Sequence, residues 1–209
     1  MSGAVITVAL MSETVVNYHQ RMARWEPDSR GRLEQAALTL YGERGFENTT
    51  VAEIAARAGV TERTFFRYFA DKREVLFWGA GALQDLLVTT VVGAPGAAAP
   101  IEVLAAALEA AAGVLQERRD SARQRQTVIA ANSELREREL IKLASLASAL
   151  AEALGRRGVT GPAATLTAEA GIAVFRVAVE RWVAEGNQRD LSELIRQSLD
   201  DLKAVTAGR

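Results

Sequence analysis

Residues 51–70, with the sequence VAEIAARAGVTERTFFRYFA, limit the possible folds of this chain more than any other stretch. Ile54 and Ala55 fall on the inner side of a short predicted helix, and Thr61 opens a second one. Between the two helices, Gly59 supplies the left-handed or tight turn geometry that a residue with a Cβ resists. Two short helices joined by such a turn are typical of a helix-turn-helix, which places its second helix in the major groove of DNA.

The helix ends around this motif are also marked in the sequence. Thr50 and Glu53 form a Thr-x-x-Glu capping box, which fixes where the first of the two helices begins. Asp71 and Glu74 repeat the arrangement and predict a further helix over residues 72–91. Two predicted caps therefore bracket the glycine turn.

Helical periodicity continues through the rest of the chain, with breaks at the glycine- and proline-containing residues 93–100 and 158–162. We find no alternation typical of strands, so we expect an all-α fold. Its parts are an N-terminal three-helix helix-turn-helix domain and a larger C-terminal helical bundle for ligand binding and dimerisation. The other predicted helices cover residues 29–45, 101–118, 120–131, 134–157, 162–185 and 191–205.

The predicted domains are continuous in sequence. Residues 22–78 are expected to form the helix-turn-helix domain, and residues 79–209 the effector-binding and dimerisation domain. Residues 1–21 lack a convincing helical stripe, and a second start-like sequence appears at Met22. We therefore interpret them as a flexible extension or the product of a mis-called start.

The composition narrows the classes of function. The chain has 209 residues, of which 49% are apolar and 24% charged, as in globular proteins. It has no cysteine, which excludes disulfides, thiolate nucleophiles and cysteine-based metal sites. Its one histidine, His19, leaves no triad or metal cluster to assemble, so we expect no cofactor, no metal and no enzymatic activity. The apolar run at residues 4–10 is too short to cross a bilayer, so we expect a cytoplasmic protein without a membrane partner.

The net charge and the placement of the charged residues point in different directions on whether the chain binds nucleic acid. The net charge is −1, and residues 22–78 hold as many acidic as basic side chains, whereas many DNA-binding domains have a positive excess. The placement of the cations matters more, because Arg63, Arg67, Lys72 and Arg73 lie on or just after the second helix of the motif. Bulk charge argues weakly against DNA binding, and local placement favours it.

The run GFENTTVAEIAARAGVTERTFFRYFADKREVL resembles the N-terminal domain of the tetracycline-repressor (TetR) family of bacterial transcriptional regulators. The resemblance is strongest across residues 29–78. The capped helix, the glycine turn, the threonine-started helix, the aromatic run and the following Asp-Lys pair all occur in the family's order. It implies that the helix at residues 61–69 enters the major groove with its N-terminal residues nearest the base edges.

The resemblance assigns roles to individual side chains of this helix and its neighbours. Arg63 is the expected base reader, because a guanidinium can make a bidentate contact with guanine, and Thr64 is the second candidate. Phe66 stands where the family commonly has tyrosine, so one phosphate hydrogen bond is lost while the apolar contact remains. Solvated surface charge is the alternative for each cation. The expected DNA contacts are Thr50, Thr61, Arg63, Thr64, Phe66, Arg67 and Lys72, with Thr50, Thr61 and Lys72 on backbone phosphates.

The resemblance also implies a homodimer that holds two recognition helices about one turn of DNA apart, roughly 34–36 Å. The last two predicted helices supply the interface in this interpretation, as a four-helix bundle with their symmetry mates. Intramolecular core is the alternative for each residue. The expected interface residues are Phe175, Val179, Trp182, Leu191, Leu194, Ile195, Leu199 and Leu202.

The middle helices are expected to enclose a pocket for a small effector, with ordinary core as the alternative for each lining residue. An apolar lining favours a lipophilic ligand, and the segment ELRERELIKLASLASALAEAL resembles regulators thought to sense acyl-CoA-like molecules. Arg118, Arg119, Arg123 and Arg125 are either a phosphate site for such a ligand or a solvated face. The expected lining residues are Phe77, Trp78, Leu83, Leu87, Leu104, Leu108, Leu115, Val128 and Ile129.

The sequence therefore predicts a one-component transcriptional regulator, a repressor that binds a palindromic operator as a dimer and is released by a small molecule. Two rival interpretations remain. The first is a DNA-binding regulator without an effector, and ligand-dependent release from DNA distinguishes it. The second is an all-helical enzyme or adaptor, which predicts no salt-sensitive DNA binding.

Overall fold

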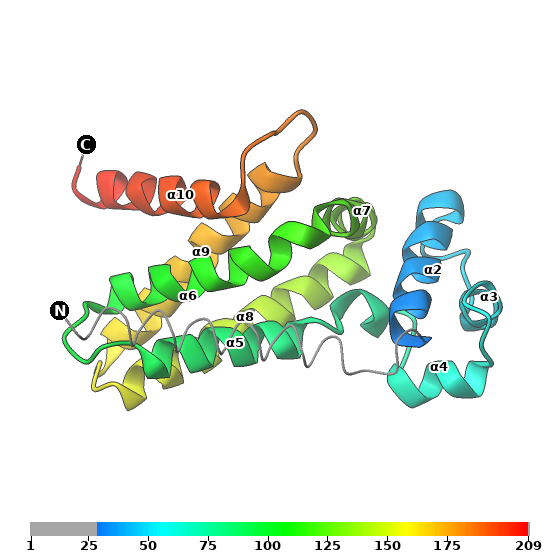
Figure 1. Cartoon of the computed structure of the whole chain (residues 1–209), viewed down its shortest axis with the longest axis horizontal. Coiled ribbons are helices and arrows are strands. Elements are labelled where there is room, and N and C mark those ends of the chain that lie inside the picture. Colours follow the sequence, from blue (N-terminus) through cyan, green and yellow to red (C-terminus); the bar gives the residue numbers. More distant parts are fainter. Residues whose placement is uncertain (1–28, 209) are drawn as a thin grey trace. The chain divides into compact units, whose positions relative to one another are not determined.

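The computed structural model describes residues 29–208, and over that range the chain forms helices and turns without strands (Figure 1), which confirms the all-α prediction. Met22, His19 and the extension proposed for residues 1–21 lie outside the described residues. The elements are α2 (Ser29–Arg44), α3 (Val51–Arg57), α4 (Glu62–Tyr68), η1 (Glu74–Phe77), α5 (Ala80–Gly93), α6 (Pro100–Leu115), η2 (Gln116–Arg118), α7 (Arg119–Ala130), α8 (Ser133–Arg156), α9 (Pro162–Val183) and α10 (Leu191–Thr206), where η marks a 3₁₀-helix.

The described residues form two compact units that are not continuous in sequence. The helix-turn-helix unit comprises residues 29–81 and 120–141, and the bundle unit comprises residues 82–119 and 142–208. The first unit thus includes nearly all of α7 and the start of α8, which the sequence interpretation assigned to the second domain. Their apolar side chains explain the difference, because three of them are buried in the core of the first unit.

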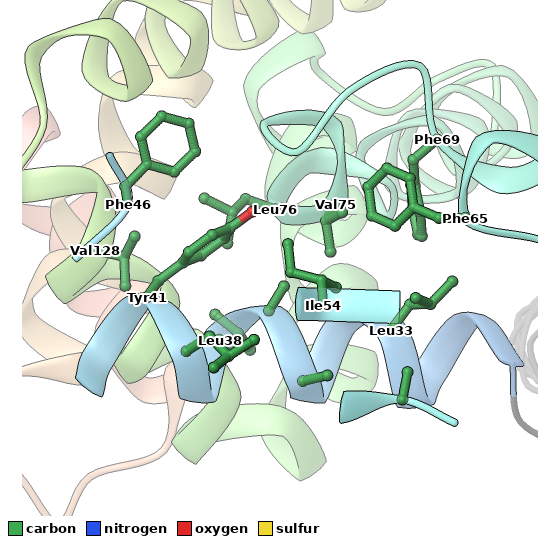
Figure 2. Close-up of a cluster of buried hydrophobic side chains, with 14 of the residues drawn as sticks. Leu33, Leu38, Tyr41, Phe46, Ile54, Phe65, Phe69, Val75, Leu76 and Val128 are labelled. Atoms are coloured by element: carbon green, nitrogen blue, oxygen red, sulfur yellow. The ribbon is translucent and has the colours of Figure 1, made fainter. Parts of the chain in front are cut away.

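That core forms around α2 (Figure 2). Leu33 and Tyr41 on α2 are buried together with Ile54 of α3 and Phe65 of α4, and the Tyr41 ring meets the Phe46 ring edge-on at a centroid distance of 5.2 Å. The small helices are therefore held by side chains on one long helix. Val75, Leu76 and Phe77 of η1, with Val128, Ile129 and Leu135 of α7 and α8, complete the core.

The bundle unit is built on contacts among α6, α9 and α10. Trp182, on α9, is 1% exposed, and Leu191, at the start of α10, is fully buried. Helices α6 and α9 approach closely at Gly171, where an added Cβ would lie 2.1 Å from Leu104 Cδ2. The missing side chain at Gly171 is what permits this crossing.

Most helix ends agree with the sequence predictions to within about two residues, but the helix predicted over residues 72–91 does not form as one element. Asp71 Oδ1 accepts hydrogen bonds from the backbone N–H of Arg73 (2.8 Å) and of Glu74 (3.1 Å), so Asp71 does cap the segment. The segment it caps is the 3₁₀-helix η1, and α5 begins only after a turn around Gly79. The Glu74 carboxylate is used elsewhere, in an ion pair with Arg138.

Two segments satisfy the length and hydropathy of a membrane span, namely Glu74–Gly93 and Pro162–Val183. A core helix of a globular protein satisfies the same criterion. Ile172, Phe175 and Trp182 of the second segment are buried, and α9 contacts α6 and α10. Burial within the bundle therefore accounts for the apolar character of α9.

Candidate DNA-binding interface

The first helix of the motif begins as the sequence predicted. Thr50 Oγ1 accepts a hydrogen bond from the Glu53 N–H (3.2 Å), and the Thr50 N–H donates to Glu53 Oε2 (2.9 Å), which completes the capping box. The hydrogen bond from the Thr50 backbone keeps the pKa of Glu53 below its usual range. Because the Thr50 hydroxyl also donates to Glu53 Oε2 (2.9 Å), its predicted phosphate contact would require an exchange of partners.

The turn confirms the role predicted for Gly59, whose φ is 68°. Its N–H donates to the Ala56 carbonyl (3.1 Å), and the N–H of Val60 donates to the Ala55 carbonyl (2.9 Å). These two hydrogen bonds form a Schellman motif, which ends α3 and redirects the chain. Ala55 and Ala58 are buried beneath it.

The second helix, α4, starts at an N-cap formed by Thr61. The Thr61 hydroxyl accepts from the Thr64 N–H (3.2 Å) and shares a further hydrogen bond with the Thr64 hydroxyl (3.1 Å). Phe65 is fully buried and Phe69 is 4% exposed, with their ring centroids 5.4 Å apart. These two aromatic side chains fix the inner face of α4 and thereby determine which residues it presents outward.

The outward face holds Glu62, Arg63, Phe66 and Arg67, all of them exposed. Arg63 makes no hydrogen bond or ion pair with any residue in the range 29–208, and Phe66 is 55% exposed. Arg67 is partly engaged, because its Nη2 donates to Tyr68 Oη (3.0 Å) and its guanidinium lies 4.8 Å from that ring's centroid. The guanidinium of Arg63 is thus available to an external partner.

Lys72, for which the sequence suggested a phosphate contact, is bonded within the free chain, and the contact itself stays a prediction. Its Nζ donates to the carbonyl oxygens of Phe46 (2.8 Å), Thr49 (3.0 Å) and Glu47 (3.3 Å), and it lies 4.3 Å from the centroid of the Phe46 ring. A lysine ammonium has three N–H donors, so all of them are in use. The hydroxyl of Tyr41 donates to the Lys72 carbonyl (2.6 Å) and holds its backbone. Lys72 therefore fastens the loop that leads into α3.

Arg30, near the start of α2, packs on aromatic side chains. Its guanidinium lies 5.2 Å from the centroid of the Tyr68 ring and 5.5 Å from that of the Trp78 ring. Burial lowers the pKa of Arg30 from its ordinary value. Arg30 is therefore part of an aromatic cluster with Tyr68 and Trp78.

The residues predicted to line one effector pocket are divided between the two units. Phe77, Trp78, Val128 and Ile129 belong to the helix-turn-helix unit, where three are buried in its core and Trp78 packs against it. The bundle unit holds the other five: Leu83, Leu87, Leu104, Leu108 and Leu115. The first four are therefore core residues of the helix-turn-helix unit.

The arginine cluster considered as a phosphate site is engaged within the protein. Arg119 Nη2 donates to the carbonyl oxygens of Trp182 (3.0 Å) and Asn187. Arg125 Nε donates to the Leu76 carbonyl (2.7 Å), and its Nη1 pairs with Glu139 (3.0 Å). Burial lowers the pKa of Arg125. These two guanidinium groups hold chain segments together, so the structure contradicts the phosphate-site interpretation for them.

Most of the predicted dimer-interface residues are buried within the single chain. Trp182 and Leu194 are 1% and 2% exposed, and only Val179 and Leu202 are partly exposed. The sequence correctly predicted that apolar side chains lie along one side of α9 and of α10. Most of these side chains are buried by other residues of the same chain. The buried residues that are thus intramolecular core are Phe175, Trp182, Leu191, Leu194, Ile195 and Leu199.

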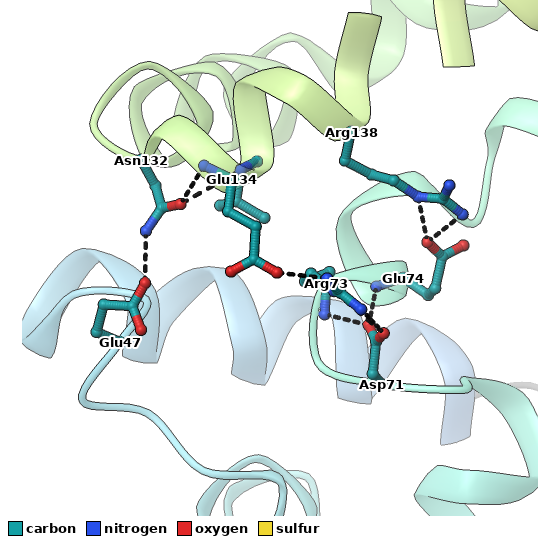
Figure 3. A network of polar contacts seen from close by, with 8 residues as sticks. Glu47, Asp71, Arg73, Glu74, Asn132, Glu134 and Arg138 are labelled. Atoms are coloured by element: carbon teal, nitrogen blue, oxygen red, sulfur yellow. Dashed lines mark hydrogen bonds and ion pairs between the residues drawn. The ribbon is translucent and has the colours of Figure 1, made fainter. Parts of the chain in front are cut away.

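Sequence reasoning missed a polar network in the helix-turn-helix unit, which Figure 3 shows. Arg73, paired with Asp71 (2.6 Å), also pairs with Glu134 at the start of α8, and Arg138 pairs with Glu74 (2.7 Å). These residues border an open, charged groove of about 560 Å³. The two ion pairs that involve α8 join residues more than 60 positions apart, so no local sequence pattern predicts them. Residues 29–208 contain no cluster of three or more His, Cys, Asp or Glu side chains suited to a metal ion.

A chain that combines a capped helix-turn-helix unit with an all-helical bundle unit belongs to the class of helix-turn-helix DNA-binding proteins. Residues 34–77 match the family profile described as bacterial regulatory proteins of the tetR family, and residues 98–207 match the MftR C-terminal domain profile. The chain therefore belongs to the TetR family of bacterial regulatory proteins.

Curated relatives match over less than half of the chain. The chain is 34% identical over 85 residues to the HTH-type transcriptional regulator TcmR of Streptomyces glaucescens, which is 41% of this chain and 38% of that protein. It is 32% identical over 98 residues to HbdR of Aromatoleum sp. (strain CIB), covering 45% of this chain and 42% of that protein. The chain thus aligns with less than half the length of these relatives.

Solved structures match over most of the chain. The TetR-family repressor FadR of Thermus thermophilus, solved in complex with lauroyl-CoA, is 26% identical with a TM-score of 0.53, covering 83% of this chain and 93% of that one. The SmeT–triclosan complex gives a TM-score of 0.62 at 22% identity, covering 85% of this chain and 90% of that one, which concerns the fold alone.

Proposed function

We propose that this protein is a one-component transcriptional regulator that represses by binding a palindromic operator as a homodimer. The observation that carries the proposal is the outward face of α4. Buried Phe65 and Phe69 hold the helix in place, while exposed Arg63 and Phe66 remain free for DNA. Bidentate hydrogen bonds from Arg63 to guanine would supply base selection, and Phe66 would contact sugar or thymine methyl groups. Such a regulator would act in the cytoplasm, without a membrane or enzymatic step.

A second copy of the chain would cover the exposed side of α9. Leu166 is 68% and Val177 is 41% exposed, and exposed Ala173 lies between them at helical spacing. Val205 of α10 is also apolar and 74% exposed. These side chains, rather than the buried ones predicted from sequence, are the candidates for the dimer interface.

The effector would be a small lipophilic molecule of the acyl-CoA type, bound in the bundle unit. Support comes from the lauroyl-CoA complex of T. thermophilus FadR, which is 26% identical to this chain. Leu87, Leu104 and Leu108 are buried there and would supply apolar surroundings for an acyl chain. Titration of lauroyl-CoA into the protein–operator complex tests this part, and release of DNA at micromolar ligand is the expected result. DNA binding unaffected by acyl-CoA of any chain length would favour a regulator without such an effector.

The test of the DNA-binding proposal is in vitro selection from random duplexes with the full chain at near-physiological salt. We expect an enriched inverted repeat whose half-sites are spaced by about one helical turn. Footprinting on the selected duplex would then show protection of both half-sites. A folded protein that enriches no sequence would overturn the proposal.

A further inference from the structure

The outward face of α4 carries a carboxylate, Glu62, beside the expected base reader. Glu62 is exposed, lies in the first turn and makes no hydrogen bond or ion pair with residues 29–208. The positions three and four residues further along are Phe65 and Phe66, so the helix supplies no cation to neutralise it. An uncompensated negative charge therefore stands on the surface proposed to meet DNA.

A carboxylate facing a polyanion is unfavourable unless it accepts a hydrogen bond from a base. In the major groove the donors are the N4 amino group of cytosine and the N6 amino group of adenine. On adenine the N7 acceptor lies next to N6 and repels a carboxylate, whereas the neighbouring edge of cytosine carries only C5–H. Cytosine is therefore the base that suits Glu62.

We propose that Glu62 is a specificity-determining residue that accepts a hydrogen bond from the N4 amino group of one cytosine in each half-site. This inference rests on the proposed DNA-binding function. Arg63, the next residue, donates to guanine, so the two side chains impose opposite requirements at two positions of the half-site. The first turn of α4 then reads a cytosine and a guanine rather than a guanine alone.

Two simpler roles for Glu62 make different predictions. An acidic side chain in the first turn stabilises a helix through its dipole, and this role would change the melting temperature without changing base preference. A carboxylate that merely repels phosphate would lower affinity for every sequence equally. Only a base contact changes which base is selected.

The test is in vitro selection with four forms of the full chain: wild type, Glu62→Ala, Glu62→Gln and Glu152→Gln. Glu152 is an exposed glutamate of α8 in the bundle unit, so its change removes one negative charge outside the helix-turn-helix unit and serves as the control. Competition titrations on the selected duplex and its single-base variants follow.

We expect wild type and Glu152→Gln to share one motif containing a cytosine in each half-site. Glu62→Ala should lose about tenfold of the discrimination at that base pair and keep it elsewhere. Glu62→Gln should shift the preference towards adenine, because an amide pairs with N6 and N7 of adenine. An unchanged motif for both Glu62 variants would overturn the proposal, and so would uniformly tighter binding to all sequences. Absence of any motif for wild type would overturn the proposed function itself.

Discussion

At the scale of single residues, Lys72 illustrates how a side chain suited to DNA can be used inside the protein. Its ammonium group is bonded to three carbonyl oxygens of the loop that precedes the N-cap Thr50. A phosphate contact would have to displace at least one of these bonds. We therefore propose that Lys72 contributes to DNA binding by positioning α3 rather than by neutralising a phosphate.

Lys72→Met should lower the melting temperature and weaken operator binding by a similar factor at every salt concentration. Loss of three hydrogen bonds to partly exposed carbonyl oxygens should cost about 1 kcal/mol or more of unfolding free energy. The measurement is operator affinity against salt concentration, together with thermal unfolding. A phosphate contact would instead reduce the slope of log K against log salt by about 0.9 per lysine, and such a reduction with unchanged stability would refute the internal role. Arg156→Met, which removes one positive charge at an exposed residue of α8, controls for altered charge.

Asp71 links the stability of the helix-turn-helix unit to pH. Hydrogen bonds from the Arg73 side chain are the main cause of the lowered pKa of Asp71. Because the folded pKa is lower than the unfolded value of about 3.9, the stabilisation is fully present above that value and is lost as pH falls through the folded pKa. Asp71→Asn should therefore be less stable than wild type at pH 7, and the difference should shrink in acid. Urea unfolding at pH 7 and pH 3 measures this, and a difference that is constant with pH would contradict it.

At the scale of elements, α3 and α4 owe their positions to local signals, whereas helix crossings in the bundle depend on partners distant in sequence. The capping box of Thr50 and the Schellman turn at Gly59 are readable from adjacent residues. The crossing of α6 and α9 is not, because it depends on the proximity of Gly171 to Leu104, 67 positions earlier.

Gly171→Ala should destabilise the bundle unit by about 1–3 kcal/mol, because overpacking displaces side chains or backbone. The new methyl group would lie 2.1 Å from Leu104 Cδ2. Gly113→Ala is the matched control, since Gly113 is helical and an added Cβ meets nothing within 4 Å. That control should stabilise the protein by about 0.5–1 kcal/mol. Denaturant unfolding measures the free energy of unfolding of both variants. Equal changes in the two variants would argue against a close crossing of α6 and α9.

The difference between local signals and contacts distant in sequence also explains how much of the structure could be predicted from the sequence. Caps and glycine stops predicted most helix ends. The contacts of Lys72 and Arg125 join residues 23 to 49 positions apart, and no local pattern encodes them. A wide apolar face on α9 or α10 can be buried within one chain or between two, and sequence alone does not tell these cases apart. Six of the eight predicted dimer residues are therefore buried in the single chain.

At the scale of the whole molecule, the function we propose requires two copies of α4 at a fixed separation. One chain carries one outward face of α4, and a palindromic operator presents two half-sites. The exposed apolar side chains of α9 are the means we propose for holding two copies together.

Leu166→Glu should convert the dimer to a monomer and weaken operator binding by at least tenfold, because charge at the centre of an apolar interface is costly to bury. Leu166 is 68% exposed in the single chain, so folding should be preserved. Val92→Glu, at an exposed valine of α5 with 46% exposure, is the control and should remain dimeric. Sedimentation velocity measures the oligomeric state, and a dimeric Leu166→Glu protein would move the interface away from this face.

The most direct measurement is the ratio of affinities for the selected operator and a scrambled duplex at physiological salt, for wild type and Arg63→Ala. If α4 reads base edges, wild type should prefer the operator by about a thousandfold or more. Arg63→Ala should lose about 1–3 kcal/mol at one position of each half-site while its binding to scrambled DNA changes little. Equal ratios for the two proteins would contradict base reading by Arg63, and a ratio near one for wild type would contradict sequence-specific DNA binding by this protein.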